Sequence, residues 1–348
     1  MASISYKCPN CDGELLFDPA SQQYKCEYCI SYFTQQQLDD MAQEQAQDES
    51  GQNERKEDEA VVYHCPSCGA QIVTDSTTAA TFCYYCHNPV VLGGRLEGRY
   101  LPDLVIPFEI TREKAVEGFL AYIKKKKFVP RSFWNRDQIE RISGVYFPYW
   151  LYDVTYDGNI QGEAKNIRTW RSGNVQYTET KQYRILRDGQ ITLKNLSVNA
   201  LKKANAVLAQ GILPYRFETM KPFRMGYLSG FLAERRDVER EEMQADVRST
   251  MKQHAKTLMT DTIAGYSSVS VHHAAFRETD EKFKYALFPV WTITYKAAEN
   301  NVYFYSMNAQ TGKVCGKLPI HYGKVLLVSV LSALAVFAIG LAGGYYLW

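Results

Sequence analysis

Eight of the nine cysteines of this chain fall into four C-x-x-C pairs. The eight are Cys8, Cys11, Cys26, Cys29, Cys65, Cys68, Cys83 and Cys86. A two-residue gap lets one tight turn aim both thiolates at a single ion, and two such turns complete a tetrahedral site of four sulfurs. In each half of the set, 14 residues separate the two pairs, which suits a short hairpin. The sequence therefore predicts two metal centres, with Zn²⁺ preferred and iron as the alternative, because iron takes the same ligands.

The two metal-binding segments are a repeat at an offset of 57 residues, with eight of 28 positions identical between 6–33 and 63–90. All eight thiolates are used up in the two sites, which leaves no open position for water, so the metals are expected to be structural. Gly69 and the pair Asp12-Gly13 supply the positive φ that such turns need. His64 and His87 flank the cysteines but are surplus to four ligands.

Charge argues against nucleic acid as a partner of these two ribbons. Residues 6–33 hold two lysines against four acids, residues 63–90 hold no Lys or Arg, and a zinc bound by four thiolates carries about −2. Phosphate contacts need Lys and Arg, so duplex binding would be opposed by Coulomb repulsion. The chain as a whole, with a net charge of +2, predicts no polyanion partner either.

The last 24 residues, 325–348, contain no charge. As a helix they span about 36 Å, against a hydrocarbon core of roughly 30 Å. Tyr345, Tyr346 and Trp348 would form an interfacial belt, so a membrane span is favoured over a buried core helix. Gly340 and Gly344 have the GxxxG spacing of helix pairs, which indicates either self-association through this helix or small residues facing lipid.

The flanking charges and the cysteines predict the same topology. Lys313, Lys317 and Lys324 precede the span, and no acid follows Glu299. The positive-inside rule then places everything before the span in the cytoplasm. The first ten residues have no apolar core after a basic region, which predicts no secretory signal, and reduced thiols require the same side of the membrane. The expected localisation is the cell membrane, single-pass, with the N-terminal part cytoplasmic.

Composition shifts divide the chain into five parts. These are a first ribbon at 1–33, an acidic Gln-rich linker at 34–60, a second ribbon at 61–92, an aromatic-rich α+β region at 99–320 and the membrane helix at 325–348. Within the α+β region the sequence Phe-Pro-x-Trp occurs at 147–150 and again at 288–291, each time after an expected helix and before strand. The expected fold class is α+β, and the region is interpreted as two related lobes.

Local patterns predict the elements of this α+β region. Thr111 is expected to cap a helix over 112–127, with Ala115, Phe119 and Ile123 among its apolar positions. A hairpin is expected over 182–193 with Asp188-Gly189 as its turn. A second helix is expected over 228–260, with one stripe of apolar or core side chains. Its stripe is Met243, Val247, Met251, His254 and Leu258.

Lys124–Lys127 is the one basic cluster, joined in sequence by Arg131 and Arg136. It suits anionic lipid as a partner of an anchored protein. Solvated lysines at a helix C-terminus, favoured by the helix dipole, are the preferred interpretation.

Enzyme signatures are missing from the sequence. There is no H-E-x-x-H, G-x-S-x-G or P-loop, and the adjacent His272 and His273 would point to opposite faces of a strand. Cys315 is interpreted as a passive thiol. The expectation is that this protein is not an enzyme.

The doubled CPxC…CxYC pattern, the stretches YFPYW and YLSGFLAER and the single C-terminal span occur here in one order. That order resembles the bacterial membrane-anchored double zinc-ribbon proteins, which are labelled general-transcription-factor-type zinc-ribbon or primosomal-helicase-like. The resemblance implies association with SPFH-type and phage-shock-type proteins in envelope stress, and zinc on the eight cysteines. We therefore expect a single-span membrane adaptor that scaffolds such a partner protein on its ribbons; a membrane-associated nucleic-acid-binding zinc-ribbon protein is the alternative.

Overall fold

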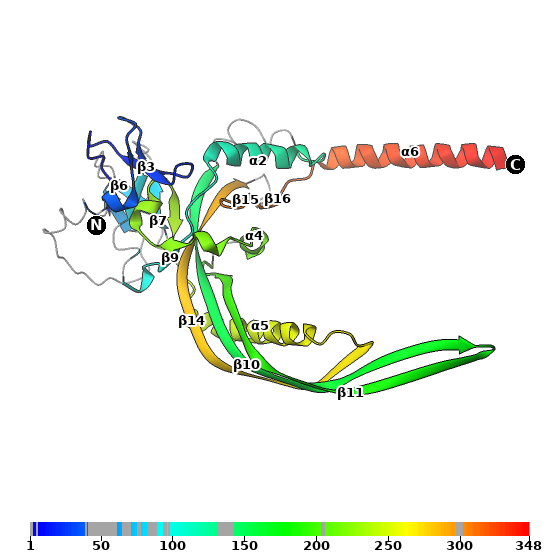
Figure 1. The fold of residues 1–348 in the computed structure, drawn as a ribbon. Helices are drawn as coiled ribbons and strands as arrows, with labels where there is room; N and C mark the ends of the chain where they lie inside the picture. The colour runs from blue at the N-terminus through cyan, green and yellow to red at the C-terminus, as the bar shows by residue number, and fades with distance from the viewer. Residues whose placement is uncertain are drawn as a thin grey trace.

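The computed structural model describes residues 3–4, 6–38, 40, 61–64, 71–74, 78–82, 89–92, 96, 98–130, 142–202, 206–296 and 302–347. The fold is α+β, as the sequence predicts, and its described residues form more strand than helix. An 11-stranded sheet forms its centre (Figure 1). The strands of that sheet are β1 (Ser3–Ile4), β7 (Thr78–Phe82), β8 (Pro89–Leu92), β9 (Leu104–Val105), β10 (Ser143–Ser172), β11 (Val175–Asn199), β12 (Lys221–Pro222), β13 (Leu232–Glu234), β14 (Ser268–Lys296), β15 (Val302–Asn308) and β16 (Val314–Lys317).

The two Phe-Pro-x-Trp stretches lie opposite each other in the middle of this sheet. They belong to β10 and β14, which run antiparallel, and Phe147 is the register partner of Phe288. Aromatic and β-branched residues fill both strands, which is typical of a buried pleated surface. Tyr149 stacks on Phe288 with ring centroids 4.4 Å apart. The two similar segments are thus the facing central strands of one sheet.

Strands β10 and β11 extend beyond the rest of the sheet as a long hairpin arm (Figure 1). The last pair between β10 and β14 is Lys165 with Ser268, so residues 166–181 form a hairpin of two strands only. The turn lies at Gly173, which has φ 63°. The predicted turn at Asp188-Gly189 is wrong. Both residues lie inside β11, because β10 continues opposite them and supplies hydrogen-bonding partners for the whole length.

A β-bulge bends the arm near its base. Asp153 faces two residues of β11, because the register shifts between Tyr152 and Val154. The backbone N–H of Asn195, which has φ 58°, donates to Asp153 Oδ1 over 2.7 Å. Lys284 Nζ lies 3.2 Å from Asp153 Oδ2. A bulge that is held from both sides bends the strand and increases its twist, which fits the curvature of the sheet in Figure 1.

Helix α2 (Arg112–Lys124) begins where the sequence predicts. The side chain of Thr111 accepts from the N–H of Lys114 over 3.5 Å, and Ala115, Phe119 and Ile123 are buried. The helix ends at Lys124, so Lys125–Lys127 form its C-cap and the following turn.

Helix α5 (Arg240–Asp261) starts 12 residues later than predicted. Residues 232–234 form β13 instead, and a capping box between Glu239 and Glu242 fixes the helix start. Met243, Val247 and Met251 are buried as expected, but His254 and Leu258 are exposed. The stripe continues in steps of four, through Ala255 and Met259, because α5 lies along the curved face of the sheet.

The N-terminal segments are joined to the same body. Strands β2 (Leu15–Asp18), β3 (Gln23–Cys26) and β4 (Tyr32–Phe33) form a small antiparallel sheet, and β5 (Val61–His64) pairs with β6 (Gln71–Thr74). Within the segment predicted as the second ribbon, β7 and β8 belong to the main sheet, where β7 pairs with β13. The remaining elements are α4 (Ala206–Gly211), η1 (Gly98–Tyr100), η3 (Phe217–Thr219), η4 (Met225–Leu228) and α6 (Tyr322–Leu347).

Helix α6 projects from the body as a single rod (Figure 1). Residues 322–341 are long and apolar enough to cross a membrane, and none of that stretch is buried in the protein. Length, composition and exposure of this stretch are those of a membrane-spanning helix. Its 26 residues span about 39 Å.

Candidate metal centre

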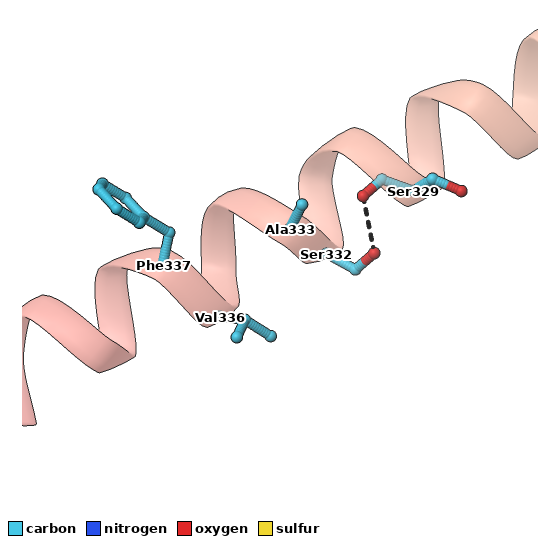
Figure 2. Close-up of a pocket in the computed structure, with 5 residues that line it drawn as sticks. All are labelled: Ser329, Ser332, Ala333, Val336 and Phe337. Carbon is cyan, nitrogen blue, oxygen red and sulfur yellow. Dashed lines mark hydrogen bonds between the residues drawn. The ribbon is translucent and has the colours of Figure 1, made fainter.

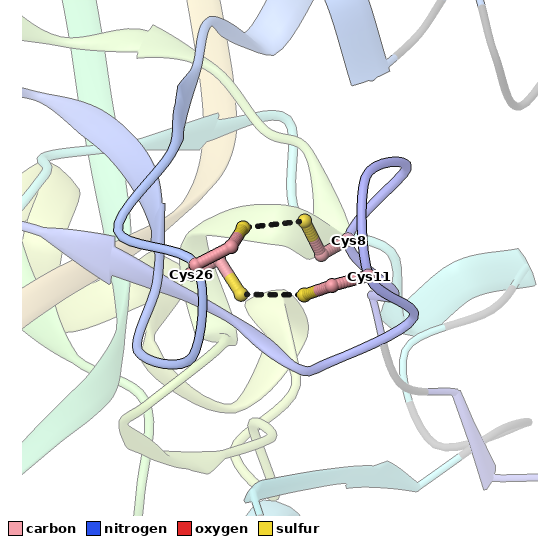
Figure 3. Close-up of side chains that lie close together, drawn as sticks. Cys8, Cys11 and Cys26 are labelled. Carbon is pink, nitrogen blue, oxygen red and sulfur yellow. Dashed lines mark hydrogen bonds between the residues drawn. The ribbon is translucent and has the colours of Figure 1, made fainter.

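The Sγ atoms of Cys8, Cys11, Cys26 and Cys29 lie together at the N-terminal ribbon. Figure 3 labels the first three of these side chains. All four Sγ atoms lie within 4.8 Å of one another. The Sγ atoms of Cys8 and Cys29 are 3.5 Å apart, as are those of Cys11 and Cys26. The structure thus joins the four cysteines that the sequence assigned to the first site.

Two turns of the same construction present these thiolates. The carbonyl of Cys8 accepts from the N–H of Asp12 over 2.8 Å, and the carbonyl of Cys26 accepts from the N–H of Ile30 over 3.0 Å. The N–H of Cys8 donates to the carbonyl of Gly13 over 2.6 Å, and the N–H of Cys26 donates to that of Ser31 over 2.9 Å. Backbone hydrogen bonds therefore set the positions of both Cys pairs.

Each turn needs one residue in the left-handed region. Asp12 takes φ 58°, as the sequence indicated for Asp12-Gly13, and Ile30 takes φ 58° in the second turn. A β-branched residue at positive φ is a genuine outlier, and strain of this kind clusters at functional sites. Gly13 is needed for another reason, because a Cβ there would come within 2.6 Å of the Tyr28 ring.

Ser31 supports the centre and was not identified from the sequence. Its Oγ lies 3.3 Å from the Sγ of Cys29 and accepts from the side-chain amide of Asn10 over 3.0 Å, so it links the two turns. Hydrogen bonding from the Ser31 hydroxyl and then from its backbone N–H lowers the pKa of Cys29 to about 6. Burial raises the pKa of Cys8. A serine two residues after a ligand is too common a pattern to be noticed in a sequence.

The geometry fits a metal ion. A tetrahedron of sulfurs about 2.3 Å from a central Zn²⁺ has edges of about 3.8 Å, close to the 3.5 Å separations here. Cys8 and Cys26 are buried and Cys11 and Cys29 are exposed, so the cluster lies at the surface with its inner half in the core. Four thiolates complete a tetrahedral shell, which suits a structural ion.

The second predicted set, Cys65, Cys68, Cys83 and Cys86, lies outside the described residues, as do Gly69 and His87. Around the first of these pairs the backbone is defined, since β5 and β6 pair antiparallel on either side of residues 65–70, with His64 opposite Gln71.

The first ribbon is packed firmly on the body. The N–H of Phe17 donates to the carbonyl of Ser229 over 3.1 Å, and the Ser229 hydroxyl donates to the carbonyl of Leu15. The rings of Phe17 and Tyr227 meet edge to face at 5.2 Å. The ribbon's apolar side chains therefore share the core of the main sheet.

Other residues that the sequence singled out are not brought together. His272 and His273 are both exposed on β14, where His272 is the extra residue of a bulge. Cys315 lies in β16, apart from the four thiolates of the first centre. A shallow hollow on α6 is lined by Ser329, Ser332, Ala333, Val336 and Phe337 (Figure 2). None of these five lining residues is ionisable. The Ser332 hydroxyl donates to the carbonyl of Ser329 over 2.9 Å and is satisfied within the helix.

Comparison with known proteins finds one full-length relative. No family model matches the chain, and no solved structure matches it. The uncharacterised protein YdjG of Bacillus subtilis (strain 168) is 31% identical over 344 residues, which cover 99% of this chain and 96% of YdjG. The aligned region spans the cysteine pairs, the sheet and the apolar helix of this chain, and identity at this level over nearly the whole of both chains places the chain in the same family as YdjG.

Proposed function

We propose that this protein is a membrane-anchored adaptor that holds a cytoplasmic partner protein at the bilayer. The observation that carries the proposal is that one folded body bears both the N-terminal cysteine cluster and the projecting helix α6 (Figure 1). One end is an apolar helix that is unburied over residues 322–341 of the described chain, and the other is a cluster of four cysteines that supplies enough ligands for a tetrahedral metal shell. Such a helix can anchor the protein in a membrane, and such a metal-bound segment can present a rigid surface to a partner.

The metal in this proposal is Zn²⁺ at two structural sites, one on Cys8, Cys11, Cys26 and Cys29 and one on Cys65, Cys68, Cys83 and Cys86. Four thiolates with no ligand position left over favour zinc in a structural role, and iron is the runner-up for the same ligand set. The repeat of the 14-residue spacing supports a second ion.

The topology in this proposal places the body in the cytoplasm. Lys313, Lys317 and Lys324 lie just before the uncharged run 325–348, which favours retention of that side in the cytoplasm. Thiolates that bind a metal need a reducing compartment, and the cytoplasm is one.

The hairpin arm supplies a partner surface. Ile160 and Ala164 of β10 are buried in one cluster with Met259 of α5. Trp170 lies on the same face of β10, because side chains alternate between the two faces of a strand. Beyond the end of α5, no element in the described part of the chain covers this face. Trp170 and Tyr177 are 44% and 45% exposed, and their rings stack at 5.6 Å. An apolar face that continues uncovered from a packed one is typical of a protein contact.

Charge indicates the kind of partner that this face binds. Between residues 165 and 184 there are five basic residues and one acidic residue. The arm therefore suits a partner with an acidic surface around an apolar patch. The resemblance in the zinc-ribbon pattern supplies the class of partner, an SPFH-type or phage-shock-type protein of envelope stress.

A crosslinking pull-down from native membranes tests the proposal. The double variant Trp170→Ala/Tyr177→Ala should lose the partner, whereas Ile167→Ala/Leu186→Ala, exposed apolar residues on the opposite face of the same arm, should retain it. Deletion of residues 325–348 should release protein and partner together from the membrane fraction. Retention of the partner at the membrane after that deletion would rule out the tether.

A further inference from the structure

The basic cluster Lys124–Lys127 lies at the point where α6 leaves the body. The carbonyl of Phe128 accepts from the N–H of His321 over 2.7 Å, and Lys324 Nζ lies 3.4 Å from the carbonyl of Val129. These contacts bring the end of α2 to the first turn of α6, although nearly 200 residues separate the two segments. Figure 1 shows the two helices meeting there.

The lysines at this junction are free to bind a ligand. All four are exposed, and within the described ranges no carboxylate lies within ion-pair distance of their amino groups. Lys126 Nζ lies 5.2 Å from the centre of the Tyr122 ring, and the amino groups of Lys124, Lys125 and Lys127 have no side-chain or carbonyl partner among the described residues. The acids of α2, Glu113 and Glu117, lie in the first half of the helix, so positive charge is concentrated at the α6 end.

Apolar side chains are exposed at the same junction. Phe128 is 37% exposed, Ile320 54% and Tyr322 80%. Aromatic and apolar side chains beside lysines, at the start of an apolar helix, are the combination found where a membrane protein crosses the headgroup layer. The helix dipole explains lysines at the end of α2, but it does not explain their position against a second, lipid-facing helix.

We propose that Lys124, Lys125 and Lys127 form a collar at the start of α6 that binds the phosphates of anionic phospholipid headgroups, with Phe128 and Tyr322 in the interface. The ligand is the lipid, because α6 places the amino groups at headgroup level. Lysine binds phosphate as a point charge, and such clusters are attracted to anionic leaflets. The proposal rests on α6 lying in a bilayer and does not depend on the adaptor role.

Lipid titration of the full-length, metal-loaded chain in detergent tests the collar, with native mass spectrometry as the readout. Phosphatidylglycerol should bind more tightly than phosphatidylcholine. Lys124→Gln/Lys127→Gln should weaken phosphatidylglycerol binding by about thirtyfold, the factor that two lysines contribute near an anionic surface. The matched control Lys252→Gln/Lys256→Gln, on exposed positions of α5, should bind as the wild type does.

Two results would overturn the proposal. One is equal phosphatidylglycerol binding by the collar variant and the wild type, with both folded as judged by circular dichroism. The other is competition by inorganic phosphate at the concentration at which the lipid itself binds, since that would indicate a site for free phosphate instead of a lipid surface.

Discussion

Trp150 donates its indole N–H to the carbonyl of Val238 over 3.0 Å, and Val238 stands two residues before the start of α5. Trp291 donates in the same way to the carbonyl of Ile110 over 2.8 Å, two residues before the start of α2. Each Trp ends one of the two Phe-Pro-x-Trp stretches. It donates to a residue just before the helix that precedes the other stretch. Together with the pairing of Phe147 and Phe288, this reciprocity supports the interpretation of residues 99–320 as two related halves.

The reciprocal contact predicts matched effects of two substitutions. Trp150→Phe and Trp291→Phe each keep most of the aromatic contact and leave one carbonyl without its donor, so each should lower the free energy of unfolding by about 1–3 kcal/mol. Chemical denaturation of the full chain in detergent measures both values. The control is Trp170→Phe, whose ring is exposed and should cost little. A large effect at one Trp only would contradict the reciprocity.

The close contact between the first ribbon and η4 predicts that a methyl group added at Gly226 separates the two. A Cβ at Gly226 would lie 2.6 Å from the Tyr24 hydroxyl, and the ring of Tyr24 is fully buried. Gly226→Ala should therefore push the first ribbon off η4 and expose residues 6–38 to protease in limited proteolysis. Gly189→Ala, whose added Cβ would lie 3.8 Å from the end of the Met259 side chain, is the matched control. Unchanged cleavage in Gly226→Ala would show that the ribbon can shift without separating.

The ion pairs beneath α5 predict a pH dependence. Arg248 donates to both carboxylate oxygens of Glu281, at 2.8 and 2.5 Å, and this contact lowers the pKa of Glu281. A carboxyl whose pKa is lowered in the folded state adds stability above its unfolded value of about 4.3, and this stability is lost as the pH falls through the folded value. Burial raises the pKa of the neighbouring Glu278, which acts in the opposite direction.

Arg248→Gln should therefore lower the unfolding temperature at neutral pH and flatten the loss of stability below about pH 4.3. Thermal unfolding followed by circular dichroism across that range measures the effect. Arg277→Gln removes an ion pair to Asp157 whose Arg side chain is 81% exposed, and it should change neither quantity. An equally steep acid loss in Arg248→Gln would assign the pH dependence to other groups.

The sequence predicted those features that depend on local spacing. Cys8, Cys11, Cys26 and Cys29 come together because C-x-x-C sets a turn, and α2 begins directly after Thr111 because the cap is a local hydrogen bond. It did not predict the length of the arm, because Asp188-Gly189 is a strong turn signal whose effect is overridden by pairing with β10. The contact of Phe128 with His321 was also beyond reach, since periodicity carries no information about which distant segments meet.

The cysteine cluster predicts how much bound metal the protein loses when one ligand is replaced. Cys8→Ser removes a buried ligand from a four-thiolate site, so bound metal in the purified full chain should fall by about one equivalent, as measured by elemental analysis. Under the two-site proposal Cys65→Ser should remove the other equivalent. Cys315→Ser is the control and should leave the metal content unchanged. An unaltered metal content in Cys8→Ser would mean that the cluster holds no ion.

The backbone conformation of Ile30 predicts that a polar substitution at this position stabilises the turn. It takes φ 58° in the turn after Cys29 and is 65% exposed, so its side chain contributes little burial while its backbone is strained by about 1–2 kcal/mol. Asn tolerates the left-handed region, so Ile30→Asn should stabilise the turn by about 1 kcal/mol and slow metal transfer to a chelator roughly fivefold. Ile30→Val keeps the β-branch and the strain and should transfer metal at the wild-type rate. Faster transfer from Ile30→Asn would show instead that the exposed Ile30 side chain itself protects the centre.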